Sequence, residues 1–210
     1  MSESFITADE IYAPRTERFT AVISRRQKTK SGKPRFYLYS MDNQNLILCA
    51  EYYFNTFINF RISQSTTSFE PETENYLGKI EHSDLSSKYI IFKQKGSEEK
   101  VKVAETSFDV NRVKFNTNSE HDRQMNISLF LNGEEPKPLE KHSFSEIKEI
   151  YPDLEIIHSK QNIYFKSEGK HCLSVSQIHD DEFLLDIDAP LSIYIGFACA
   201  LTAMVKVRGE

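Results

Sequence analysis

The sequence is poor in the residues that mark several protein classes. It has no tryptophan, seven glycines, seven prolines and three cysteines among 210 residues. Cys49, Cys172 and Cys199 are odd in number and lack CxxC spacing, which argues against a disulfide framework or a structural zinc site. Reduced thiols in a reducing compartment fit better. The longest uncharged run, Ala189 to Val205, is shorter than the roughly 20 residues that a membrane-spanning helix needs.

Signals for secretion and catalysis are also missing. No basic segment followed by an apolar segment stands at the N-terminus, so we expect no secretory signal and a cytoplasmic or nuclear location. GxGxxG, Gx4GK[ST], GxSxG and HExxH motifs do not occur. The six histidines lack ligand spacing, and the acidic run His179 to Glu182 is typical of a turn rather than a metal site. We therefore expect a non-enzymatic protein without a cofactor or metal.

The composition favours strands over helices. Isoleucine, phenylalanine, tyrosine, valine and threonine supply 63 residues, and alanine supplies only nine. Short runs with period-two alternation, or rich in β-branched and aromatic residues, recur between polar breaks. These runs are 18–24, 35–40, 46–53, 57–64, 76–80, 89–95, 100–106, 112–115, 125–131, 154–158, 162–166, 171–178 and 183–187. About a dozen short strands without intervening helices indicate an antiparallel barrel or sandwich.

Two helices are expected near the C-terminus. Ser143 and Glu146 have the spacing of a capping box, and a short helix should follow and end before Pro152. Asp188 is expected to cap a second helix, with Pro190 in its first turn, and the run to Val205 carries no charge on any face. A helix that is apolar all round must be buried, so it should run through the middle of the barrel.

These patterns define the expected architecture. We expect a mainly β fold, a closed antiparallel β-barrel of about twelve strands around a central hydrophobic C-terminal α-helix. Residues 1–12 are expected to form a weakly ordered lead-in, and residues 13–210 a single domain.

The formal net charge of −5 hides a strong asymmetry. Residues 15–35 carry eight cations and one acid, so the other 189 residues sum to −12. Gly32 and Pro34 indicate a loop between two strands, and six cations lie within residues 25–35, which we call the basic loop. They are Arg25, Arg26, Lys28, Lys30, Lys33 and Arg35. This cluster predicts binding to a polyanion such as anionic phospholipid headgroups, although a solvated hairpin loop would have the same composition.

Two segments carry a resemblance to a known family. They are Asn75-Tyr-Leu-Gly-Lys-Ile80 through Lys88-Tyr-Ile-Ile-Phe92, and Pro190-Leu-Ser192 with Phe197-Ala198, Ala200 and Leu201. The first is similar to the "N/S-Y/F-I-G-K-L … T-K-F-T-V" stretch, and the second to the "PLSxxQAFAxAL" terminal helix, of the tubby C-terminal domain family. Looser similarities in the same order extend the resemblance from about residue 18 to residue 205.

The resemblance implies a twelve-stranded barrel around a hydrophobic helix and a non-enzymatic role. Domains of this family bind phosphatidylinositol 4,5-bisphosphate at the plasma membrane and act as adaptors or regulators, some with ciliary or nuclear roles. The chain departs from the family at headgroup-binding positions. Glu51 to Asn55 replaces a Lys/Arg run, and Glu81 replaces an arginine. No headgroup ligand transfers to these positions, and the matching Lys79 and Lys88 are expected to be mainly structural.

The sequence therefore favours a module that associates reversibly with anionic membrane through the basic loop. Tyr52, Tyr53, Phe54 and Phe57 are either interfacial anchors or, as is commoner in a barrel, packing residues. Two alternatives stay open. One is a protein-interaction scaffold that has lost lipid binding, favoured by the two acids. The other is a nuclear or nucleic-acid-associated regulator that uses the basic loop.

Overall fold

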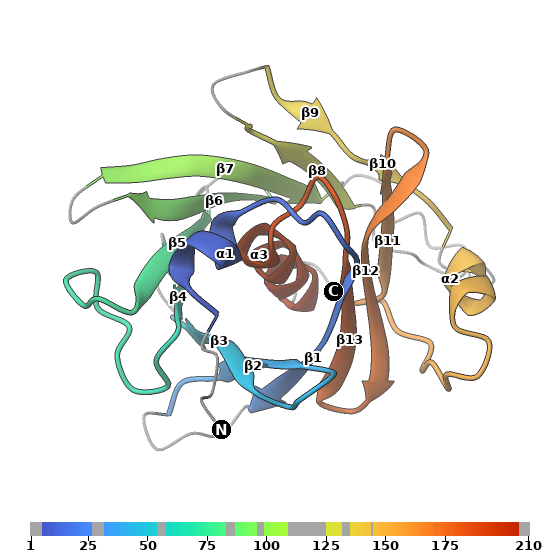
Figure 1. Cartoon of the computed structure of the whole chain (residues 1–210), viewed down its shortest axis with the longest axis horizontal. Helices are drawn as coiled ribbons and strands as arrows, with labels where there is room; N and C mark the ends of the chain where they lie inside the picture. Colours follow the sequence, from blue (N-terminus) through green and yellow to red (C-terminus); the bar gives the residue numbers. More distant parts are fainter. Residues whose placement is uncertain are drawn as a thin grey trace.

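The computed structural model describes residues 6–26, 32–53, 58–82, 87–95, 99–108, 125–131, 135–143 and 145–205. Within these residues, thirteen antiparallel strands form one sheet that curves into a nearly closed barrel (Figure 1). The strands are β1 (Phe19–Arg26), β2 (Arg35–Ser40), β3 (Leu46–Tyr52), β4 (Ile58–Ser63), β5 (Tyr76–His82), β6 (Lys88–Lys95), β7 (Glu99–Phe108), β8 (Met125–Leu129), β9 (Lys137–Pro138), β10 (Glu140–Lys141), β11 (Ile163–Ser167), β12 (Lys170–His179) and β13 (Glu182–Ile187).

The pairing follows the chain, except where the sheet closes on itself. Strands β1 to β9 pair in sequence order, while β13 pairs with β1 and continues through β12 and β11 to β10. The two end strands, β9 and β10, are separated in sequence only by Leu139, which is buried. One continuous segment therefore ends the sheet on both sides, and the expected barrel architecture is confirmed.

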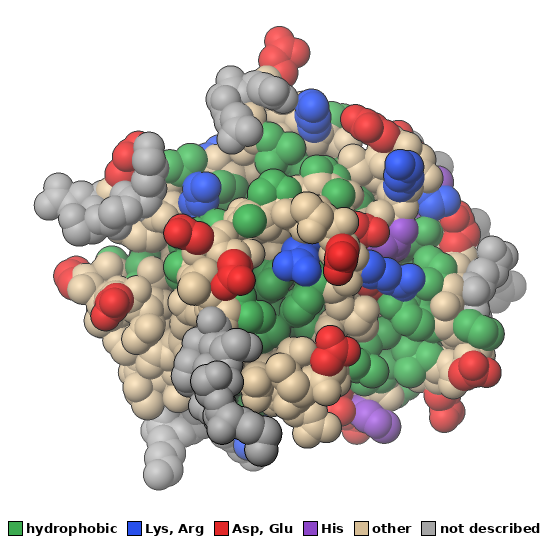
Figure 2. All heavy atoms as spheres, viewed as in Figure 1, with side chains coloured by type: hydrophobic (Ala, Val, Ile, Leu, Met, Phe, Trp, Pro, Cys, Tyr) green, Lys and Arg blue, Asp and Glu red, His purple; other side chains and the backbone are tan. Residues whose placement is uncertain are grey.

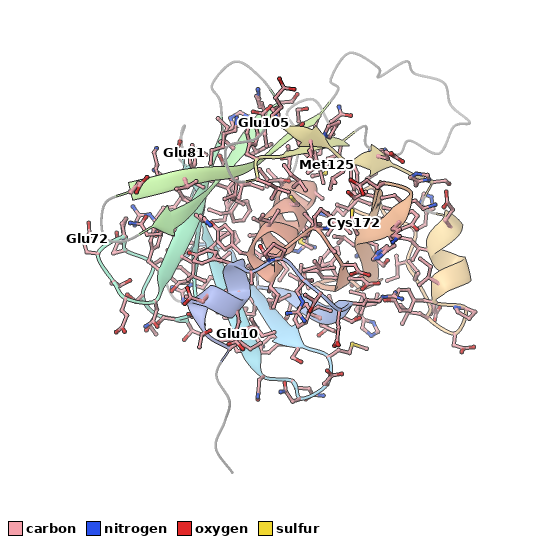
Figure 3. All side chains as sticks on the ribbon, turned by 45° about the horizontal axis from the view of Figure 1, so that its top comes forward. Glu10, Glu72, Glu81, Glu105, Met125 and Cys172 are labelled. Atoms are coloured by element: carbon pink, nitrogen blue, oxygen red, sulfur yellow. The ribbon has the colours of Figure 1, made fainter. Side chains whose placement is uncertain are left out.

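Alternation along each strand separates a core face from an outer face. In β2, Phe36 and Leu38 are buried in the core, whereas Tyr37 and Tyr39 lie on the outer face and stack on each other. Since successive strands repeat this pattern around the barrel, apolar side chains fill its interior. Figure 3 shows this filling, with side chains projecting from the wall toward the helix.

Helix α3 (Ile193–Met204) occupies the centre of the barrel (Figure 1). Its side chains are all buried, which confirms the expectation drawn from its apolar sequence. The helix begins one turn later than expected, because Ser192 rather than Asp188 is its N-cap and accepts a hydrogen bond from the Ile195 amide at 3.2 Å. Asp188 instead accepts from the amide of Ala189. Pro190 therefore precedes the helix and does not lie in its first turn.

Helix α1 (Ala8–Tyr12) lies within the segment expected to be a lead-in. Thr7 and Glu10 form a capping box, and Ile11 is fully buried in the core. The Tyr12 hydroxyl donates to the carbonyl oxygen of Leu77 at 2.5 Å, and its ring packs edge-on against Tyr194 of α3. Residues 8–12 thus close one end of the barrel against α3, while the proposed domain boundary at residue 13 stays a prediction.

Helix α2 (Ser145–Ile150) packs outside the barrel beside β11 (Figure 1). It ends at Ile150, before Tyr151 and Pro152, as the sequence predicted. The Tyr151 hydroxyl donates to Asp186 on β13 at 2.5 Å, and Arg18 pairs with the same carboxylate. Asp186 points away from the core because its neighbours Leu185 and Ile187 point inward, yet it is fully buried beneath this segment. Burial and the bond to Asp186 raise the pKa of Tyr151 to about 12, so its hydroxyl remains a donor.

The strand expected at 154–158 does not form. This segment runs outside the wall as irregular chain, and the Ile157 amide donates to the carbonyl oxygen of Gln177 at 2.8 Å. The prediction was wrong because both sides of β12 are already paired, one with β11 and the other with β13. The other expected strands coincide with β1 to β8 and β11 to β13, apart from 112–115, which lies outside the described residues. No described helix has the length and apolar character needed to cross a membrane.

Candidate anion-binding surface

The β1–β2 hairpin carries the six cations singled out in the sequence. Arg25 and Arg26 end β1, and Arg35 begins β2 directly opposite Arg26. Lys33 precedes β2, while Lys28 and Lys30 lie outside the described residues. Since neighbouring residues of a strand point to opposite faces, Arg25 and Arg26 diverge, and the four described cations of the hairpin do not all lie on one face.

Arg25 contacts the turn that joins β12 to β13. Its Nε donates to Asp181 Oδ1 at 2.8 Å, its Nη2 donates to the Asp180 carbonyl oxygen at 3.0 Å, and its guanidinium lies over the Phe183 ring. Its backbone amide also donates to the Asp181 carbonyl oxygen. The basic loop is therefore joined to an acidic turn that lies far away in the sequence.

Arg26 is the most accessible of the four described cations. Its side chain is exposed, and its guanidinium lies 6.0 Å from the centroid of the Tyr37 ring on the outer face of β2. No ion pair joins it to a described carboxylate. This arginine could contact an external anion without breaking an internal ion pair.

Lys33 and Arg35 enclose the carboxylate of Glu51. Lys33 Nζ lies 3.1 Å from Glu51 Oε1, and Arg35 donates to Oε2 from Nε at 2.9 Å and from Nη2 at 2.6 Å. The Glu51 side chain is only 5% exposed. Burial alone would raise the pKa of Glu51, but hydrogen bonds from Arg35, Lys33 and Tyr53 outweigh it, and the pKa lies below its ordinary value. Glu51 is thus an ionised carboxylate in a cationic enclosure.

The same outer face continues across β4 and β5 with a cation that the sequence reasoning missed. Arg61 is the register partner of both Glu51 and Lys79, and it pairs with Glu70. Its guanidinium also lies over the Tyr53 ring, on which Lys33 packs as well. The alternation of Arg61 with the buried Phe60 and Ile62 was the available signal, because it places Arg61 on the outer face.

Glu81 repeats the arrangement of Glu51. Lys79 Nζ lies 2.5 Å and Lys100 Nζ 3.2 Å from Glu81 Oε1, and these contacts hold the pKa of Glu81 below its ordinary value against the effect of burial. Lys88 is likewise paired, with Glu105 on β7. Figure 3 labels Glu81 and Glu105, and Figure 2 shows acidic and basic side chains interspersed over one face of the molecule. Both acids noted in the sequence therefore neutralise local cations.

The aromatic residues after β3 differ in their environments. Tyr52 packs edge-on against the buried Phe60, with ring centroids 5.0 Å apart, as expected of a packing residue. Tyr53 lies between the cations Lys33 and Arg61. Phe54 and Phe57 lie outside the described residues. The contact with Phe60 favours the packing role for Tyr52.

The remaining sequence candidates are the acidic run His179 to Glu182 and the three cysteines. His179 to Glu182 form the β12–β13 turn and, with Ile157, line an open depression of about 520 Å³. Among the described residues, no three histidine, cysteine or acidic side chains are placed to share a metal ion. The three cysteines are free and buried, and burial raises the pKa of the Cys49 and Cys172 thiols to about 12. These thiols are poor nucleophiles at neutral pH.

Comparison with known proteins adds an independent finding. A search of curated proteins finds no match. The family model described as "Tub family" matches residues 11–149, which is more than half of the chain. The matched region runs from α1 to α2 and includes the segment from Asn75 to Phe92, while α3 lies beyond it. Together with the barrel and its central helix, this match shows that the chain belongs to the Tub family.

Proposed function

We propose that this domain is a non-enzymatic binding module that associates reversibly with an anionic membrane surface through the basic loop and acts as an adaptor or regulator. Membership of a family of phospholipid-binding, non-catalytic domains supports the general class. The observation that carries the proposal is the exposed Arg26, which stands at the base of a hairpin with six cations on a chain of net charge −5.

The expected free energy of membrane binding is consistent with reversible association. A basic residue near an anionic surface contributes about 1 kcal/mol, so six would contribute on the order of 6 kcal/mol at most. Salt screens part of this energy. The internal pairing of Arg25, Lys33 and Arg35 reduces it further. Binding of this strength suits a peripheral protein at the cytoplasmic face of the plasma membrane.

Selectivity for phosphatidylinositol 4,5-bisphosphate is a separate question. A bisphosphate headgroup needs several convergent cations with free donors. Glu51 and Glu81 already accept hydrogen bonds from the cations around them. We therefore expect binding to follow the total negative charge of the membrane more closely than the identity of the headgroup.

Vesicle co-sedimentation at low salt tests the proposal. The vesicles are phosphatidylcholine alone, phosphatidylcholine with phosphatidylserine, and phosphatidylcholine with phosphatidylinositol 4,5-bisphosphate, the last two matched in total charge. The test variant changes Arg26, Lys28 and Lys30 to alanine. Its charge-matched control changes Lys137, Lys160 and Lys170 to alanine. These three lysines are exposed and far from the loop in sequence.

The proposal predicts that both anionic vesicles bind the wild type and the control, and that the loop variant binds poorly. Failure of the wild type to bind any anionic vesicle would remove the membrane function. A scaffold for protein partners would then be favoured, because the pairing of Glu51 and Glu81 with neighbouring cations is the observation that supports a domain without lipid binding.

A further inference from the structure

Two acids from outside the basic loop contact cations at its two ends. Asp181 pairs with Arg25 at the end of β1, and Glu51 pairs with Lys33 and Arg35 at the start of β2. Three of the four described cations of the loop are therefore bound to carboxylates of the same chain. Arg26 is the exception among them.

The two pairs differ in accessibility. Glu51 is 5% exposed and accepts hydrogen bonds from Arg35, Lys33 and Tyr53, so an external anion cannot easily replace it. Asp181 is 50% exposed, and its partner Arg25 is 19% exposed. An external phosphate could therefore compete with Asp181 for the guanidinium of Arg25, whereas Arg35 stays bound to Glu51.

Each carboxylate has two effects on an approaching anion. It occupies N–H donors that a phosphate oxygen would otherwise accept from, and its negative charge repels the phosphate at short range. Arg35 is further committed by its bond to the Thr66 carbonyl oxygen at 2.8 Å and by its position over the Phe69 ring. The positive charge that the loop can offer is therefore smaller than its composition indicates.

We propose that Glu51 and Asp181 are internal counter-ions of the basic loop and limit its affinity for an anionic phospholipid surface. The inference rests on the proposed membrane function and concerns the regulation of that same surface. Removal of either carboxylate charge releases cations that are already in place at the ends of the hairpin.

Four single variants test the inference, and each raises the net charge by one. Glu51→Gln and Asp181→Asn remove the counter-ions. Asp180→Asn is the control for the turn, because the Asp180 carboxylate forms no ion pair with any described cation. Glu72→Gln is a control on the exposed loop between β4 and β5 (Figure 3). Binding is measured with phosphatidylcholine–phosphatidylserine vesicles across a salt series, and folding is checked by thermal melting.

We expect Asp181→Asn and Glu51→Gln to raise the apparent affinity about fivefold, the factor that corresponds to one additional basic residue near an anionic surface. Glu72→Gln should change it less than about twofold, because a distant charge is screened. Asp180→Asn should raise it less than Asp181→Asn does, because the Asp180 carboxylate occupies no N–H donor of Arg25. If the controls raise affinity as much as the test variants, the effect is one of net charge and the inference is wrong. Because Asp181 is half exposed, its variant remains informative even if Glu51→Gln fails to fold.

The outcomes separate the two proposals. If the wild type binds through the loop but neither test variant exceeds its control, the counter-ion inference fails and the membrane function stands. If the wild type binds weakly and the test variants bind well, the counter-ions are supported directly. If no variant binds at low salt, both proposals fail. In a parallel measurement, soluble inositol trisphosphate is added as a competitor to distinguish a free phosphate ligand from the membrane surface. The inference requires that the protein bind the vesicles themselves.

Discussion

The hydroxyl of Tyr194 occupies the space that a side chain on Gly78 would need. Tyr194 extends from α3 to donate a hydrogen bond of 2.5 Å to the carbonyl oxygen of Phe92 on β6, and Gly78 lies beside this bond on β5. A Cβ on Gly78 would come well within 3.0 Å of both oxygens. The backbone of Gly78 also has a φ of +149°, which other residues rarely adopt. The glycine therefore lets the central helix bond directly to the barrel wall.

Replacement of Gly78 by alanine should destabilise the protein by about 3 kcal/mol or more, because it combines overpacking with backbone strain. Gly169→Ala is the matched control. It also has a positive φ, but no atom lies within 4 Å of the added Cβ, so its cost should be nearer 1 kcal/mol. Urea denaturation measures both. Adding Tyr194→Phe should not rescue Gly78→Ala, since the Phe92 carbonyl oxygen still blocks the Cβ.

The buried threonine pair between β7 and α3 gives a second prediction. Thr106 donates to Thr202 Oγ1 at 3.1 Å, and Thr202 donates to the Cys199 carbonyl oxygen at 2.8 Å. Thr202→Val leaves the Thr106 hydroxyl buried without its acceptor and should cost about 2 kcal/mol, whereas Thr106→Val should cost about 1 kcal/mol. In a double-mutant cycle, the double variant should be no less stable than Thr202→Val. Additive costs would show that the hydroxyls are not coupled.

Gly196 of α3 packs closely against Ile187 of β13. A Cβ there would lie 2.5 and 2.7 Å from the Cδ1 and Cγ1 atoms of Ile187. Gly196→Lys should abolish soluble folding, because it would bury a charge where even a methyl group does not fit. Gly196→Ala should be destabilised, and Ile187→Val should restore part of that loss by removing Cδ1. A soluble, cooperatively melting lysine variant would contradict the central position of the helix.

His171 predicts a pH dependence of stability. Burial lowers the pKa of His171 below its ordinary value, and Arg18 adds to this effect while Asp186 opposes it. The unfolded chain therefore takes up a proton more readily than the folded one as the pH falls through about 6.5. The folded state should lose up to about 1.4 kcal/mol per pH unit below that point, until the folded pKa is reached.

Denaturation at pH 7.5 and 5.5 tests this behaviour. His171→Phe should lose less stability than the wild type between the two pH values. It should also fold at pH 7.5, because His171 Nε2 is buried without a hydrogen-bond partner and Tyr164 stacks on the ring. Tyr164→Phe keeps the histidine and should retain the wild-type dependence. Equal pH profiles for wild type and His171→Phe would assign the effect to other groups.

Much of the fold follows from short-range sequence patterns. Period-two alternation, or enrichment in β-branched and aromatic residues, located eleven of the thirteen strands, because one face of each strand packs on the core. The uncharged run before Val205 determined that its helix is surrounded by protein, as charges on any face would have prevented burial. The two-residue strands β9 and β10 were missed because they are too short to show a period.

Tertiary structure decided which of the described cations of the basic loop are paired with acids. Composition located the basic loop, but Asp181 is 156 residues from Arg25, and Glu51 is 16 residues from Arg35. These acids reach the loop only because β13 pairs with β1 and β3 pairs with β2 in particular registers. The alternation along each strand decides which face packs on the core, but the pairing of β13 with β1 joins opposite ends of the chain and depends on the closure of the barrel. The sequence determined that the hairpin is basic, and the pairing of β1 with β13 and of β2 with β3 determined which of its described cations are neutralised and that Arg26 remains accessible.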